Sequence, residues 1–235
     1  YATSADGIHW QRPSLGLVEW KGSRDNNIFL SRFEGPHSVF EKPDEPDPQK
    51  RYRMLCLSPD RERWVLFYSP DGIHWPQNES EETLLFPKTG ILARDVATLI
   101  YDHRTSQWVM VCKLCRKVRD HPYGYARRCL GVTTSQDCRN WEYPQLILVP
   151  DERDDARTAQ RCARYAERLT TYHRDEVFCD FQQMVVWPYE GVYVGLISVF
   201  DASGMSPHQN QDGLAHIELA VSRDLRHWER VADRA

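Results

Sequence analysis

The sequence of 235 residues lacks both a long apolar run and a strong excess of one charge. Its longest uninterrupted apolar stretch, 192–200, is about nine residues, whereas roughly 20 are needed for a helix to span a bilayer. The formal net charge is −4 and 27% of the residues are charged, so a basic groove is not expected. We therefore expect a globular chain with no nucleic-acid partner and no membrane segment. The oligomeric state stays open.

A cysteine or histidine pattern of the kind that binds zinc is also missing. The seven cysteines are an odd number, and a chain of this length needs no disulfide framework. Cys112 and Cys115 form one Cys-x-x-Cys pair, but no second pair follows at zinc spacing. We expect buried thiols, no metal site and no cofactor.

Helical periodicity is nearly absent. The exception is 154–169, where alanines and a leucine recur at spacings of three and four. The remaining sequence consists of short apolar or alternating runs bounded by Pro, Asp and charged residues, which is typical of antiparallel strands. These patterns predict an all-β protein with one helix on a loop insertion.

One phrase of seven residues occurs in four copies with the frame Ser-x-Asp-x-x-x-Trp. The copies are SADGIHW (4–10), SPDGIHW (69–75), SQDCRNW (135–141) and SRDLRHW (222–228). Ser and Asp side chains bind local backbone groups and favour a tight turn, and the Trp is expected to pack between neighbouring units. Because the same residues recur, whereas a catalytic residue is needed once, we interpret the phrase as structural.

The copies divide the chain into units of about 65 residues with four short strands each, a pattern typical of β-propeller blades. The strands predicted in the second unit are HSVFEKP, RYRMLCL, RWVLFYS and GIHW, and NWEYP and HWERV close the next two units. We expect one propeller domain over 1–235, containing the end of one blade (1–13), three blades (36–78, 91–145, 176–231) and an insertion (151–175). A closed ring needs more blades, so a piece of a longer chain is expected.

Polar residues that interrupt the first strand of each unit are the candidate site, because first strands line the central channel of a propeller. They are His37, Glu41, Arg94, Asp95, Thr98, Glu176, Asp180 and Gln182. Carboxylates converging from several blades suit glycoside hydrolysis, in which one protonates the leaving oxygen and another activates water or attacks the sugar. Trp187, at the end of such a strand, either stacks on a sugar ring or packs in a turn beside Pro188.

Several segments resemble glycoside hydrolases of families 32 and 43. They are ARDVATLIYDHRTSQWVMVCK, SPDGIHW, GLVEWKGSRDNNIFL, PDEPDPQKRYRMLC and CDFQQMVVWPYEGVYVGL, the last four being most similar to bacterial family 32-like glycosyl hydrolases. The resemblance implies a five-bladed propeller that cleaves a carbohydrate substrate and is secreted or periplasmic. By position, it implies that Asp95 stabilises the transition state or tunes the acid, with Arg94 beside it. It also implies that Asp180 or Glu176 is the general acid.

The sequence departs from the family pattern at three points. Val96 stands where family 32 has proline, the Glu of EVFCDF is one residue too far from its Asp, and no Asn-Asp-Pro-Asn-Gly nucleophile motif occurs. Glu41 is either a substitute for that nucleophile or part of a solvated loop. The alternative to a hydrolase is a non-catalytic propeller that binds a glycan or a protein. A sialidase is disfavoured, because no arginine triad with a Tyr nucleophile can be assigned.

Overall fold

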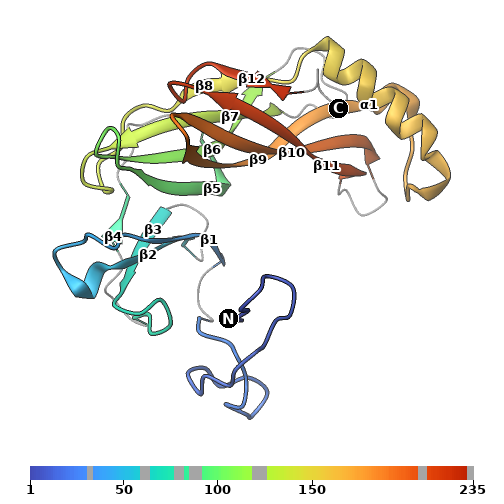
Figure 1. Cartoon of the computed structure of the whole chain (residues 1–235). Coiled ribbons are helices and arrows are strands. Elements are labelled where there is room, and N and C mark those ends of the chain that lie inside the picture. The colour runs from blue at the N-terminus through green and yellow to red at the C-terminus, as the bar shows by residue number, and fades with distance from the viewer. Residues whose placement is uncertain are drawn as a thin grey trace. The chain divides into compact units, whose positions relative to one another are not determined.

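The computed structural model describes residues 1–30, 34–58, 64–76, 82–84, 92–117, 126–205 and 211–231, with the backbone alone at 34–37, 82–83, 92–95, 117 and 126. The chain forms two compact units, Tyr1–Leu84 and Leu85–Ala235. The described strands form three antiparallel sheets of four strands each, which confirms the all-β prediction (Figure 1). The number of blades and the closure of a ring stay predictions.

The first unit contains one sheet in which consecutive strands are neighbours. Its strands are β1 (Glu34–Glu41), β2 (Tyr52–Leu57), β3 (Trp64–Ser69) and β4 (Glu82–Thr83), with a 3-10 helix at Pro48–Lys50. β2 and β3 are apolar runs predicted as strands, and nearly all of their residues are buried. The core of this unit is made by Met54, Cys56, Val65, Phe67 and Trp75.

The second unit contains two sheets with the same order of strands. The first sheet consists of β5 (Leu92–Asp102), β6 (Gln107–Lys117), β7 (Ala126–Ser135) and β8 (Gln145–Leu148). The second consists of β9 (Phe178–Tyr189), β10 (Val192–Met205), β11 (Gln211–Ser222) and β12 (Trp228–Arg230). In each sheet, consecutive strands are antiparallel neighbours, which is a meander.

The two sheets of this unit pack face to face through β9. Val109 and Val111 on β6 belong to the same buried cluster as Phe181 and Met184 on β9. Thr98 on β5 donates a hydrogen bond of 2.8 Å from its hydroxyl to the main-chain carbonyl of Met184. β9 is therefore fixed against its neighbouring sheet by apolar contacts and by a buried hydrogen bond.

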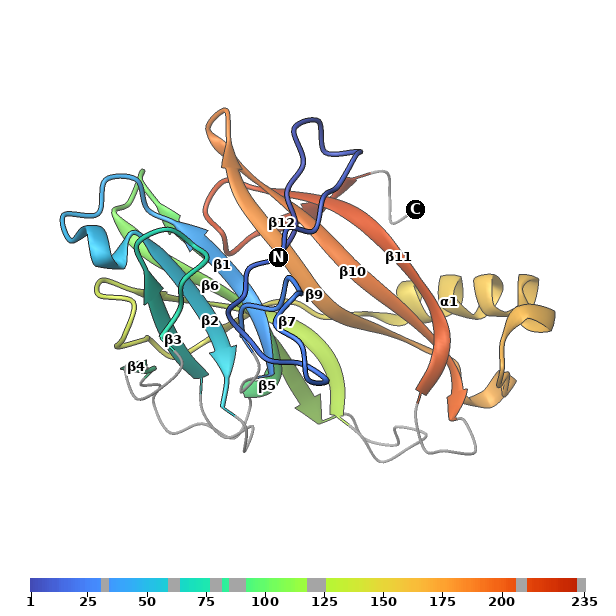
Figure 2. The ribbon, with the colours of Figure 1, turned by 90° about the horizontal axis from the view of Figure 1, so that it is seen from below.

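One helix, α1 (Glu152–Arg164), lies against the end of β10 and is held there largely by charged groups (Figure 2). Asp151 caps the helix by accepting hydrogen bonds from backbone N–H groups of its first turn. Thr158 and Arg161 both donate to the fully buried carboxylate of Asp201 on β10. No helix in the described part of the chain is long and apolar enough to cross a membrane.

Every copy of the repeated phrase forms the same turn. The Asp carboxylate accepts hydrogen bonds of 2.7–2.9 Å from the second and third backbone N–H groups that follow it. The Trp indole donates to the carbonyl three residues before it, at 2.9–3.2 Å. That carbonyl belongs to a residue with positive φ, namely Gly7, Gly72, Cys138 or Leu225. The structural interpretation of the phrase as a turn is consistent with these contacts.

Two of the predicted fourth strands are wrong. GIHW (72–75) and NWEYP (140–144) lie in or directly after the turn, whereas β4 begins at Glu82 and β8 at Gln145. The carboxylates of Asp71 and Asp137 already bind backbone N–H groups in these segments. A β-strand would need those N–H groups for hydrogen bonds to a neighbouring strand. Because the Asp side chains already bind them, these segments form a turn.

Candidate functional site

The face of β6 and β7 that packs on β9 changes from apolar to charged towards one end. Its residues, along β6 and then along the paired part of β7, are Val109, Val111, Lys113 and Cys115, then Arg128, Leu130 and Val132. The apolar half contacts the core residues of β9. The other half brings Lys113 and Arg128 towards the beginning of β9, and we call it the charged end.

Asp180 on β9 is the carboxyl group of the charged end. Its side chain is buried, and the residue is only 1% exposed. The backbone N–H of Arg128 donates to Oδ1 at 2.9 Å, and the guanidinium of the same residue lies 3.2 Å from Oδ2. Arg128 therefore holds both carboxylate oxygens, and its guanidinium also donates to Gln211 on β11.

Gln182 lies two positions further along β9. Its amide oxygen accepts a hydrogen bond of 3.4 Å from the Nζ of Lys113. The structure thus brings two of the predicted site residues, Asp180 and Gln182, to the charged end, together with two cations that alternate with apolar residues on the neighbouring sheet.

The charged end changes the acidity of Asp180. Burial raises the pKa of its carboxyl to about 6, and the opposing effects of the Arg128 N–H and of the charges of Arg128, Arg127 and Lys113 are smaller. An ordinary Asp has a pKa of about 3.9. A carboxyl with this raised pKa can both release and accept a proton near neutral pH.

Three predicted residues have side chains outside the described part of the chain: His37, Arg94 and Asp95. The backbone of β5 is described, and its register shifts between the pairs Leu92–Leu114 and Ala97–Cys112. Residues 93–96 therefore lie opposite Lys113. The main chain of Asp95 is beside the charged end.

Glu176 and Thr98 have other partners. Glu176 belongs to a 3-10 turn, Arg174–Glu176, just before β9, and its carboxylate lies 3.0 Å from Nδ1 of His173. The Thr98 hydroxyl is buried and donates to Met184, which gives it a packing role between the sheets.

Glu41 belongs to the other unit, and Trp187 lies far along β9 from Asp180. Glu41, in the first unit, forms an ion pair with Arg51 at 2.6 Å on the surface. Trp187 is 37% exposed. In the β9–β10 register, Trp187 lies opposite Val194 and Asp180 lies opposite Phe200, so roughly 20 Å of strand separates Trp187 from Asp180.

The two cations of the charged end, Lys113 and Arg128, are not among the residues predicted from the sequence. Lys113 interrupts the apolar run QWVMVCKLC, and Arg128 precedes the apolar run CLGV. A lone charge inside a strand that is otherwise buried is a signal, because burying it requires a partner. The partner of Arg128 is Asp180, which could be found only once the sheets were packed together.

The Cys-x-x-Cys pair does not form a metal site. Cys112 and Cys115 are three positions apart on β6, so their side chains leave opposite faces of the strand. Burial raises the pKa of the Cys112 thiol to about 12, which disfavours the thiolate that a metal requires. Among the residues that the structure describes, no three His, Cys, Asp or Glu side chains are grouped to hold a metal.

Comparisons with known proteins find similarity at the level of structure. No family model matches the chain, and no curated protein matches it. A solved N-acetylgalactosamine deacetylase from F. plautii, in complex with blood group B trisaccharide, is similar over 98% of this chain and 59% of that one, with 15% identity and a TM-score of 0.54. A GH32 β-fructofuranosidase from Bombyx mori has 14% identity over 77% and 32%, with a TM-score of 0.48. An α-L-arabinanase from Penicillium chrysogenum has 11% identity over 82% and 48%, with a TM-score of 0.44.

The first of these likenesses shows a shared fold. At 15% identity the likeness shows the fold alone and does not extend to activity or to catalytic residues. The chain spans 59% of the length of that deacetylase chain.

Proposed function

We propose that the protein is a glycoside hydrolase on a five-bladed β-propeller, acting on an oligo- or polysaccharide with Asp180 as its general acid. The observation that carries the proposal is the buried carboxyl of Asp180 with its raised pKa, at the start of a first strand. The shared fold supports a carbohydrate substrate. The resemblance to families 32 and 43 supports cleavage of a glycosidic bond.

Hydrolysis requires a carboxylic acid that is protonated when the glycosidic oxygen leaves. With a pKa of about 6, roughly a tenth of Asp180 keeps its proton at pH 7, compared with roughly a thousandth for an ordinary Asp. The proton passes from the carboxyl oxygen to the leaving oxygen as the glycosidic bond breaks. Arg128, which contacts both oxygens, stabilises the carboxylate that remains.

Asp95 is the proposed second carboxylate, with Arg94 beside it. Its main chain lies opposite Lys113, which supports a position near Asp180. It would attack the sugar or stabilise its positive charge, and a separation of ~5 to 5.5 Å or ~6.5 to 9.5 Å between carboxylates distinguishes retention from inversion. Glu176 is the alternative acid. Gln182, at the charged end, is the best supported of the proposed sugar-binding residues. His37, Glu41 and Trp187 are proposed as well, and Thr98 is the least supported of the set because its hydroxyl is used by Met184.

A propeller that binds glycans without cleaving them is the second candidate. It is favoured by the burial of Asp180, because a carboxylate that is 1% exposed and held at both oxygens by Arg128 can serve packing alone.

The test uses the full-length protein with pairs of glycosides that share a sugar and differ in the leaving group. Asp180→Asn should reduce hydrolysis of oligosaccharides on the order of 10²-fold or more and leave activated dinitrophenyl glycosides much less affected, because these need no protonation. Glu176→Gln tests the alternative acid in the same way. Asp137→Asn is the control, since this carboxylate belongs to a turn.

Two results would change the assignment. An active protein in which Asp180→Asn cleaves both substrate classes at the parent rate would exclude Asp180 as the acid. A protein that binds oligosaccharides but releases no sugar from them would favour the binding propeller.

A further inference from the structure

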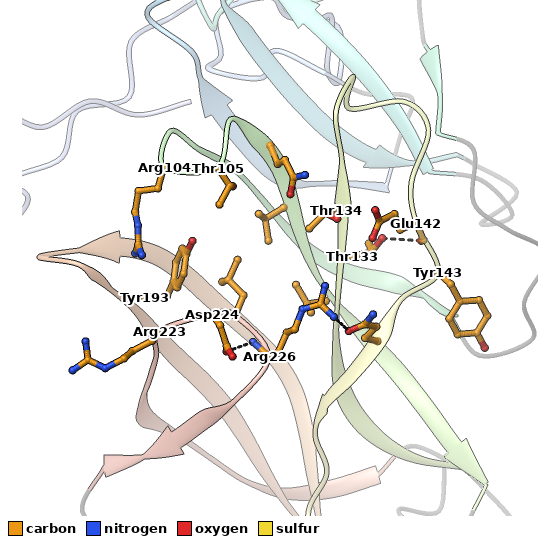
Figure 3. Close-up of a pocket in the computed structure, with 15 residues that line it drawn as sticks. Arg104, Thr105, Thr133, Thr134, Glu142, Tyr143, Tyr193, Arg223, Asp224 and Arg226 are labelled. Atoms are coloured by element: carbon orange, nitrogen blue, oxygen red, sulfur yellow. Dashed lines mark hydrogen bonds between the residues drawn. The ribbon is translucent and has the colours of Figure 1, made fainter.

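The second unit has a cavity of about 370 Å³ at the end of the sheets where the phrase turns lie (Figure 3). It is lined by the β5–β6 hairpin, the end of β7, the segment before β8 and the last copy of the phrase. Tyr193, on β10, lines the cavity. Asp180, on β9, lies opposite Phe200 of β10. Seven residues of β10, roughly 23 Å, therefore separate this cavity from the charged end.

Two arginines at the cavity keep unused hydrogen-bond donors. The guanidinium of Arg104 lies over the ring of Tyr193, 4.9 Å from its centroid, and makes no hydrogen bond to a described residue. Arg226 donates to the amide oxygen of Gln145. Neither has a carboxylate ion-pair partner within the described ranges. Because each guanidinium has five N–H donors, both can still bind an oxyanion.

The acidic residues of the cavity do not neutralise these arginines. Asp224 accepts hydrogen bonds from the backbone N–H groups of Arg226 and His227, and its second oxygen lies 2.6 Å from Nδ1 of His227. Glu142 is exposed at the opposite side of the cavity (Figure 3). Of the three arginines in the lining, Arg223 points away from the cavity (Figure 3). Arg104 also attracts the carboxylate of Asp102, which accepts the Tyr193 hydroxyl, but forms no ion pair with it.

The aromatic residues of the cavity offer no free ring face to a neutral sugar. Tyr143 points away from the cavity, and the ring of Tyr193 is covered by Arg104 (Figure 3). The Tyr193 hydroxyl is used as well, because it donates to Asp102 at 2.6 Å. Stacking is the usual way to bind an uncharged ring, so recognition here has to depend on charge.

We propose that this cavity binds an acidic saccharide, with one carboxylate or sulfate group bound by Arg104 at one side of the cavity and another by Arg226 at the other side (Figure 3). Gln107 and Glu142 lie in the lining to bind sugar hydroxyls. The volume falls within the ~300 to 1,000 Å³ of small-ligand pockets and exceeds the space that an inorganic anion fills. The proposal does not rest on hydrolysis, because none of these residues belongs to the charged end.

Calorimetric titration of the full-length protein tests the proposal with four probes. They are trigalacturonate, its fully methyl-esterified form, a sulfated galactose trisaccharide and inorganic sulfate. One or both acidic saccharides should bind, and their affinities show whether carboxylate or sulfate is preferred. Binding should weaken severalfold between 50 and 300 mM NaCl, since ~0.1 M salt already screens charges beyond ~10 Å. The methyl ester should bind at least tenfold more weakly than trigalacturonate if the carboxylate is recognised.

The chain offers a matched control for the variant. Arg104→Gln combined with Arg226→Gln should weaken binding at least tenfold, with an unchanged thermal transition. Arg139 occupies in the third phrase the place that Arg226 has in the fourth, but does not line the cavity. Arg139→Gln should therefore bind like the parent. The proposal would be overturned if no probe binds, if inorganic sulfate binds as tightly as the saccharides, or if the double variant binds like the parent. It would also be overturned if trigalacturonate and its methyl ester bind with equal affinity and the sulfated trisaccharide does not bind.

Discussion

Residues 4–10 and 69–75 are two copies of one phrase that differ only at Ala5 and Pro70, yet their surroundings are different. The local hydrogen bonds match, because each Asp accepts the same two backbone N–H groups at 2.8–2.9 Å. Trp75 is 5% exposed, whereas Trp10 is 62% exposed. Seven residues thus specify a turn, but they do not specify whether its Trp is buried.

The difference comes from what lies beneath the indole ring. Trp75 packs on apolar residues of β2 and β3, which are continuous strands. In 1–30 the described pairings are two isolated bridges, Thr3–Gln11 and Trp20–Ser23. Local hydrogen bonds form within the phrase, while burial needs a sheet that other parts of the sequence supply.

The largest expected effect is that of Trp75→Ala. Removing a buried Trp should lower the free energy of unfolding by roughly 3–5 kcal/mol, because a cavity is left in the core. Trp10→Ala, at an exposed position, should change it by less than ~0.5 kcal/mol. Urea unfolding, with hydrogen exchange of β2 and β3 peptides, measures both. Equal losses would show that burial does not distinguish the copies.

Asp180 and Asp71 extend the comparison to two aspartates whose pKa values shift in opposite directions. Burial raises the pKa of Asp180 to about 6. Burial would also raise that of Asp71, but hydrogen bonds from His74 and Ile73 outweigh it and lower the pKa. Asp180 binds its proton more tightly in the folded state, so its contribution to stability falls as pH rises from about 4 to 6.

Asp180→Asn should remove that fall. The stability of the parent relative to the variant should decrease between pH 4 and pH 7 by on the order of 2–3 kcal/mol, which corresponds to a shift of about two pH units. Urea unfolding of both proteins at four pH values provides the measurement. A difference that is constant, or that grows with pH, would contradict the raised pKa.

Much of the fold could be predicted from the sequence, because strands such as β2 and β6 are apolar runs bounded by turn residues. The fourth strands β4 and β8 could not, since they are two and four residues long and carry little periodic signal. The end of the phrase has a clearer strand pattern than β4, but the hydrogen bonds from its backbone N–H groups to Asp71 prevent a strand there.

The candidate site was predictable only in part, for a different reason. Asp180 and Gln182 stand out as polar residues in an apolar first strand. Their partners Arg128 and Lys113 lie 52 and 69 positions away in sequence, respectively. The pattern of one strand does not indicate which face of a sheet packs against it. The contacts of the charged end could therefore be identified only from the packing of the two sheets.

Asp71→Ala should have a smaller effect than either substitution above. Loss of a carboxylate that caps backbone N–H groups typically costs about 1–2 kcal/mol. Because its pKa is lowered in the folded state, this contribution is present above about pH 4 and is lost as pH falls further. The parent and variant should therefore converge in stability at low pH in thermal melts. A difference that persists unchanged at pH 2 would show that the charge is not involved.

The smallest expected difference separates Gly72→Ala from Gly7→Ala. Both glycines have φ near +75°, so each alanine costs about 1 kcal/mol in the left-handed region. A Cβ on Gly72 would lie 3.1 Å from the ring of Tyr52, whereas nothing lies within 4 Å of one on Gly7. Gly72→Ala should therefore cost a few tenths of a kcal/mol more, unless the ring moves aside. Repeating both substitutions in a Tyr52→Leu background separates strain from crowding: the extra cost should disappear there, and its persistence would assign the difference to the backbone.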